Sequence, residues 1–185
     1  MVVGLIIGGI VVLILVIFIA CYNGLVHKKA AVEEGFSTMD VYMKKRYDLI
    51  PNLVETVKGY AKHEKETLDN IIKARGANYA DMTPEQKIES SQNISRMIPN
   101  IMALAESYPE LKANENFMQL SGELSHVEQD IANARKYYNG CVKNYNIACR
   151  AFPSGMIASM FHFEEAKMYE VADETERENV KVSFN

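Results

Sequence analysis

The first 21 residues contain no Asp, Glu, Lys or Arg, and this uncharged run constrains the chain more than any other feature. Residues 2–22 read VVGLIIGGIVVLILVIFIACY, which as a helix is long enough to span a hydrocarbon core of about 30 Å. Val and Ile favour strands in water, but in lipid a helix is required because each backbone polar group needs an internal partner. We therefore predict a transmembrane anchor over residues 1–24.

Two alternatives to an uncleaved anchor involve processing. A secretory signal peptide has a basic start and an apolar stretch of about 7–15 residues, whereas here Met1 alone precedes a longer run. The sequence Phe18-Ile19-Ala20-Cys21 approximates the small-residue pattern before a lipidated cysteine. That alternative places the body outside the cell on a lipoprotein-like anchor at Cys21. The bulky Phe18 and the missing basic start disfavour it.

Basic residues are found only on the C-terminal side of the span. Lys28 and Lys29 follow it closely, and residues 44–46 add a Lys-Lys-Arg run further on. The positive-inside rule therefore favours a cytoplasmic C-terminal body. The expected partner of residues 1–24 is membrane lipid.

Composition excludes several function classes for the remaining chain. The 185 residues carry 20 Lys and Arg against 24 Asp and Glu, a net charge of −4. Without a basic excess, nucleic acid is not an expected partner. Three widely spaced cysteines make no disulfide framework. We find no glycine-rich phosphate loop, nucleophile elbow or HExxH motif, so we expect no cofactor and no enzymatic activity.

Apolar residues after the span recur at steps of three and four, which is the helical period. The series is Val32, Phe36, Met39, Met43, Ile50, Leu53, Val57, Tyr60 and Ile71, with Arg46 and Glu64 in apolar slots of the same phase. Because the phase passes through Pro51 unchanged, we predict one helix over residues 25–75, kinked at that proline.

Two further helical patterns follow. A shorter helix is expected to start at Pro84, with Thr83 as its N-cap and Pro99 inside it. A longer helix carries eleven hits at heptad spacing: Phe117, Leu120, Leu124, Val127, Ile131, Ala134, Tyr138, Cys141, Tyr145, Ala148 and Phe152. A last helix over about 156–171 and an acidic tail over 172–185 complete an all-α chain, with residues 25–171 as its body.

Two sets of residues are candidates for a role. Gly4 and Gly8 lie four residues apart in the span with Gly9 beside them, the small-xxx-small pattern of close helix packing. Polar residues on or beside the apolar faces predict a buried network that maintains helix register, with a binding groove or subunit contact as the alternative. They are Arg46, Asp48, Asn52, Glu64, Asn139 and Asn146.

Metal and thiol chemistry find weak support. Glu123 and His126 form one Glu-x-x-His pair, whereas a di-iron bundle needs two such motifs plus two more glutamates. We therefore predict no metal site. Cys141 and Cys149 lie about 12 Å apart along one helix, which is too far for a disulfide, and Cys141 occupies a core position.

A series of motifs runs in order from residue 22 to the C-terminus, and its most distinctive block is DLIPNLV at 48–54. It comprises Tyr22-Asn23, Lys45–Val54, Val57–Glu64, Ala74-Arg75, Glu106–Pro109, Leu111–Asn114, Phe117, Ala134-Arg135, Tyr138-Asn139, Tyr145-Asn146, Phe152-Pro153 and Val180–Phe184. The series resembles the LemA family of bacterial membrane proteins. Phe36 stands where that family usually has Trp, and Lys45-Arg46 replaces an Arg pair.

The resemblance implies an N-terminal transmembrane helix followed by an antiparallel bundle of long helices in the bacterial inner membrane. It implies no reaction, although some relatives are linked to magnetosome membranes, a precedent by analogy for membrane organisation. We expect a membrane-anchored scaffold or assembly protein that forms homo-oligomers and binds partners. An accessory or regulatory subunit docking onto a membrane enzyme is the alternative, and an uncharacterised enzyme comes third.

Overall fold

The computed structural model describes residues 1–61, 63–75 and 78–169. All regular elements in this part of the chain are helices and none is a strand, so the predicted all-α class is confirmed. The elements are α1 (Val2–Lys58), α2 (Lys65–Arg75), the 3₁₀ turn η1 (Tyr79–Asp81), α3 (Pro84–Ser107), α4 (Pro109–Lys112), α5 (Glu115–Arg150) and α6 (Ser154–Met160). The predicted acidic tail, 172–185, lies outside the described residues.

Helix α1 begins in the uncharged run and continues far beyond it. Its N-terminal apolar window is long enough to cross a membrane and is fully exposed. The helix passes through Pro51 without a break, as the unchanged apolar phase predicts. A proline costs one backbone hydrogen bond inside a helix, and here the buried side chains on both sides of it offset that loss.

The prediction that this helix extends to residue 75 is wrong. Helix α1 ends at Lys58 and α2 begins at Lys65, so residues 59–61 and 63–64 belong to neither helix. The last turn is closed by the Tyr60 and Ala61 backbone N–H groups, which both donate to the Val57 carbonyl, at 3.0 and 2.9 Å. Tyr60 and Glu64 therefore lie in the connection and not on a helix face.

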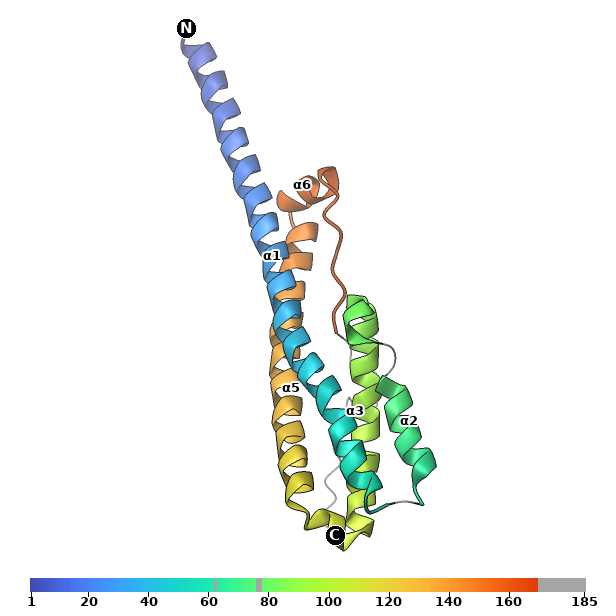
Figure 1. Ribbon diagram of the computed structural model, residues 1–185. Helices are drawn as coiled ribbons and strands as arrows, with labels where there is room; N and C mark the ends of the chain where they lie inside the picture. Colours follow the sequence, from blue (N-terminus) through green and yellow to red (C-terminus); the bar gives the residue numbers. More distant parts are fainter. Residues whose placement is uncertain (62, 76–77, 170–185) are drawn as a thin grey trace, which may run out of the picture. The chain divides into compact units, whose positions relative to one another are not determined.

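The chain divides into two compact units, and α1 and α5 each contribute to both. The first unit comprises Met1–Met39 and Asn133–Met168, and the second comprises Asp40–Ala132 together with Tyr169. In the second unit the C-terminal part of α1, α2, α3 and the N-terminal part of α5 alternate in direction (Figure 1), giving an antiparallel bundle. Its apolar core includes Met43, Ile50, Leu53, Val57, Leu68, Ile71, Ile94, Ile101, Leu124, Val127 and Ile131.

Helix α3 starts where the sequence predicts. The Thr83 hydroxyl accepts from the Gln86 backbone N–H at 3.3 Å, and the Gln86 side chain accepts from the Thr83 N–H at 2.8 Å. This reciprocal pair satisfies two N–H groups that the helix itself cannot pair. Pro84 occupies the first turn, and Pro99 lies inside the helix.

The first unit pairs α1 with the C-terminal part of α5. Gly35 allows these helices to approach closely, since a Cβ there would lie 3.2 Å from the Cα of Tyr138. Most of the predicted heptad face of α5 is buried, but Cys141 is half-buried and its neighbour Val142 is fully buried. Phe152 is wrong as a core position, because α5 ends at Arg150 and Phe152 is 84% exposed.

The predicted last helix, 156–171, is also wrong in extent. Helix α6 spans Ser154–Met160, and positions 170 and 171 of the predicted helix lie outside the described residues. His162 then adopts a positive φ of 56°, a left-handed conformation that ends a right-handed helix. Residues 163–169 are not helical, and the Tyr138 hydroxyl donates to the Lys167 carbonyl at 2.9 Å.

Candidate functional site

Arg46 is the centre of a buried polar cluster in the second unit. Its side chain is fully buried on α1. One terminal nitrogen, Nη1, donates to Ser95 Oγ at 2.7 Å and to Glu128 Oε1 at 2.6 Å. The other, Nη2, donates to the Ser91 carbonyl at 2.6 Å and also to the Ser91 hydroxyl.

This cluster connects three helices through one side chain. Arg46 comes from α1, the two serines from α3, and Glu128 from α5. A guanidinium has donors in a rigid fork and stays charged, so its burial requires acceptors in set positions on the neighbouring helices. Among the described residues, its Nε is left without a hydrogen-bond partner. The arrangement specifies the packing of α1 against α3 and α5.

A second polar cluster lies near the start of α3. The Tyr79 hydroxyl donates to Asp40 Oδ1 at 2.6 Å, and Lys87 Nζ donates to Asp40 Oδ2 at 2.8 Å while lying 4.9 Å from the centre of the Tyr79 ring. Burial, followed by the hydrogen bond to Asp40, raises the pKa of Tyr79 well above its usual range. The phenol therefore remains a neutral donor.

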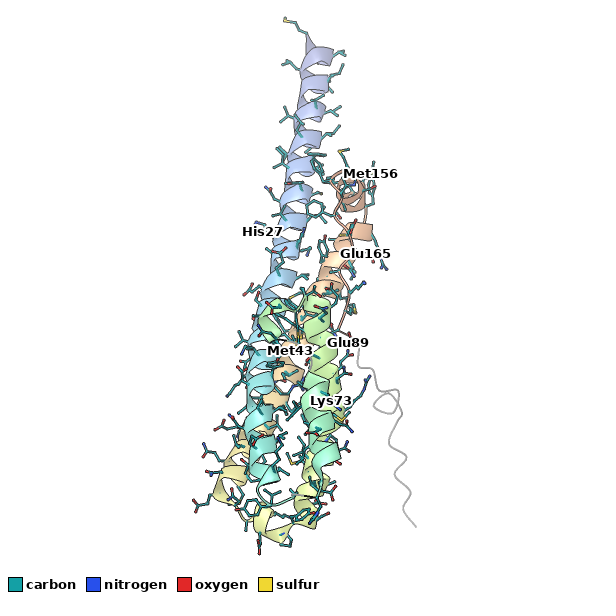
Figure 2. All side chains as sticks on the ribbon, turned by 45° about the vertical axis from the view of Figure 1, so that its right-hand side comes forward. His27, Met43, Lys73, Glu89, Met156 and Glu165 are labelled. Carbon is teal, nitrogen blue, oxygen red and sulfur yellow. The ribbon has the colours of Figure 1, made fainter. Side chains whose placement is uncertain are left out.

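In the first unit, Asn146 holds the segment that follows α6. Its Nδ2 donates to the Ala166 carbonyl and its Oδ1 accepts from the Ala166 N–H, both at 2.9 Å. Nearby, Arg150 Nε donates to Glu165 Oε1 at 2.6 Å, and this pairing lowers the pKa of Glu165. Figure 2 labels Glu165 in that segment. The amide of Asn146 thus supplies the backbone pairing that a strand would otherwise provide.

The other predicted polar residues lie apart from these clusters. Asp48 is exposed and forms an ion pair with Lys44. Asn52 is exposed on α1, while Glu64 is half-buried in the connection after it. Asn139 is half-buried on α5. Arg46 alone of the six belongs to the buried cluster between helices, because both of its terminal nitrogens donate to acceptors on α3 and α5.

The glycines of the span are open. A Cβ built at Gly4, Gly8 or Gly9 meets no atom within 4 Å, and the large apolar side chains around them are exposed. Small residues on one face of a helix permit close backbone approach where two helices pack in a membrane.

Groups that could carry metal or thiol chemistry do not gather in the part of the chain that the structure describes. No three His, Cys, Asp or Glu side chains there are placed to hold an ion. Glu123 accepts a hydrogen bond from Gln119 Nε2 at 3.1 Å, and His126 is exposed. The three cysteines are free thiols and half-buried.

Sequence reasoning missed the partners of Arg46. Ile94, Ile98 and Ile101 recur at helical spacing along α3, and Ser91, three residues before Ile94, continues that series by one step and is buried. A serine in an apolar slot of one helix and an arginine in an apolar slot of another form a complementary pair. The sequence therefore indicated that Arg46 and Ser91 are partners. Ser95 and Glu128 lie beside the apolar faces, so the sequence pattern did not indicate their role.

Comparisons with known proteins agree with the family resemblance that the sequence motifs indicate. A model of the LemA family matches residues 35–184, which begin within α1 after the apolar segment. Protein LemA of Metamycoplasma hominis is 23% identical over 168 residues, covering 90% of this chain and 76% of that relative.

Proposed function

Because this chain belongs to the LemA family, and because its N-terminal helix is apolar and exposed as a membrane anchor requires, we propose that it is a membrane-anchored helical scaffold. It acts by forming homo-oligomers through the span and by presenting its helical body to partners. Anchoring confines the copies to two dimensions, which raises their effective concentration.

The observation that carries this proposal is the open glycine surface of α1. Lipid tails are as apolar as the side chains of the span, so helices associate in membranes through close van der Waals contact. Gly4 and Gly8 lie on one face with Gly9 adjacent to them, and a Cβ built at any of the three meets no atom within 4 Å. In the body, by contrast, the terminal nitrogens of Arg46 donate to the chain's own acceptors.

The test is the mass of the complex extracted in mild detergent, together with cross-linking in native membranes. The variant Gly4→Leu/Gly8→Leu keeps the span apolar but blocks close approach, so we expect a smaller or heterogeneous complex. Ile6→Leu/Ile10→Leu is the matched control, because these exposed residues lie on the opposite face of the helix. An unchanged oligomer in the glycine variant contradicts the proposal, and a monomeric wild type favours the accessory-subunit function.

We further propose a cytoplasmic body, from Lys28 and Lys29 just after the span. A tag placed after Asn185 should then resist external protease in intact cells, and digestion of the tag would contradict the proposed orientation.

Cys21 packs against the cluster of Leu25, Ile157 and Ala158, which suits a small free thiol within an uncleaved helix. Intact-mass measurement decides between that state and a lipidated Cys21 at a new N-terminus.

A further inference from the structure

A second uncharged run lies close to the C-terminal end of α5. Residues 151–163 read AFPSGMIASMFHF and lie between Arg150 and Glu164 without any Asp, Glu, Lys or Arg. Four of its apolar side chains are exposed: Phe152 (84%), Met156 (65%), Met160 (65%) and Phe161 (45%). Figure 2 labels Met156 on α6. Clustered apolar side chains of this size mark an interaction surface.

The other side of α6 is packed against α1. Ile157 and Ala158 are buried in a cluster with Leu25. The Phe161 ring lies 5.9 Å from that of Phe18 and 4.9 Å from that of Tyr22, measured between ring centres. In Figure 1, α6 lies beside α1, whose N-terminal part extends beyond it.

These contacts place α6 where the uncharged run of α1 ends. Tyr22 is the last residue of the apolar segment, and the first charged residues, Lys28 and Lys29, follow about 9 Å further along the helix. When α1 spans a bilayer, this level is the boundary between acyl chains and headgroups. Tyrosine is enriched at that depth because its ring is apolar and its hydroxyl polar.

We propose that residues 152–161, which we name the α6 wedge, insert into the bilayer surface beside α1 and contact phospholipid acyl chains. The inference rests on the proposed anchoring by α1. Apolar helices lying in the interface bury one face about 5–10 Å into the headgroup–acyl boundary. The exposed Phe and Met side chains supply that face here, and the uncharged run removes the desolvation cost of inserting ions.

The surroundings of the wedge suit a lipid. An open hollow of about 400 Å³ lies between α1 and the end of the wedge, lined by Tyr22, Val26, Phe161 and Phe163 with Lys29 and His162 among the polar residues. Glu33 also lines it. The aromatic and aliphatic side chains beside the Lys29 ammonium suit the junction of an acyl chain with a phosphate headgroup.

The wedge is held in place by the end of α5. The Ser154 hydroxyl donates to the Ala148 carbonyl at 2.7 Å. A Cβ at Gly155 would lie 2.9 Å from the Cys149 carbonyl oxygen, so only glycine fits this close approach. Because α6 is packed against both α1 and α5, its exposed side chains remain directed outward.

The chain contains no tryptophan, so a single introduced indole reports its own environment. The experiment uses the full chain in phosphatidylcholine vesicles with and without bromine on the acyl chains, and compares emission from Phe152→Trp, Val12→Trp and Val41→Trp. Val12 lies in the uncharged run, and Val41 is exposed on α1 well beyond it. Met156→Trp is a second reporter of the wedge.

We expect brominated lipid to quench Val12→Trp, Phe152→Trp and Met156→Trp and to leave Val41→Trp unchanged. Quenching of Val12→Trp with wedge reporters that behave like Val41→Trp overturns the inference while leaving the anchor intact. Absence of quenching at Val12→Trp overturns the anchoring itself. A blue shift of the wedge reporters that needs high protein density and shows no bromine quenching assigns the surface to a second copy of the chain, and also overturns the inference.

Discussion

Arg46 and Glu128 form an ion pair whose two side chains are unequally buried. We therefore expect replacement of each residue by an apolar one to lower the free energy of unfolding by different amounts. The Arg46 side chain is 0% exposed and that of Glu128 is 33% exposed. Glu128→Leu strands a buried cation, whereas Arg46→Met leaves a carboxylate that water can reach. Deleting one partner of a buried pair costs about 3–5 kcal/mol. We expect that range for Glu128→Leu, and about 1–2 kcal/mol for Arg46→Met because the carboxylate regains hydration.

The double variant Arg46→Met/Glu128→Leu distinguishes a stranded charge from lost packing. It places apolar side chains at both positions, and such replacement of a buried pair is close to neutral. The double variant should therefore be more stable than Glu128→Leu alone. The assay is thermal unfolding of the full chain in detergent followed by circular dichroism. About 1 kcal/mol shifts the midpoint by about 2–4 °C in a chain of this size, so Glu128→Leu should lower it by about 6–20 °C.

Asp48→Asn is the matched control, because it removes the charge from an ion pair on the same helix. Both side chains of that Lys44–Asp48 pair are about half exposed, and such pairs contribute about 0.5 kcal/mol or less. Equal losses from the two single variants of the buried pair would refute the reasoning. So would a double variant that unfolds no later than Glu128→Leu.

Three further changes test local features. Burial raises the pKa of Tyr145 to about 12, above the usual value of about 10 for tyrosine. The neutral phenol therefore contributes its full stabilisation below about pH 10 and loses it as the pH rises further. Tyr145→Phe should flatten the alkaline part of the plot of unfolding free energy against pH. Asn146→Ala removes both bonds to Ala166 and should speed amide hydrogen exchange there, equivalent to about 1–3 kcal/mol of local opening. Thr83→Ala loses the reciprocal cap with Gln86 and should lower the unfolding free energy in urea by about 1 kcal/mol, whereas Thr83→Asn should restore it.

The sequence by itself determined the features that depend on local order along the chain. The uncharged run determines which segment is long and apolar enough to cross a membrane, because its length and lack of charge are properties of consecutive residues. The period of three and four determined the all-α class and most of the buried faces, including Met39, Met43 and Ile50 on α1. Thr83 and Pro84 predicted the start of α3, since capping involves only neighbouring residues.

The tertiary structure alone decided where the helices end and which side chains meet. The apolar phase continues past Lys58, but α1 ends there and α2 packs against α3 as a separate helix. Similarly, periodicity cannot show that α5 ends at Arg150 and leaves Phe152 exposed. The position of Arg46 in an apolar slot predicts a buried charge, but the sequence pattern does not show that its acceptors come from α3 and α5. Helical period describes one face of one helix, whereas turns and partners depend on the burial gained when separate helices pack together.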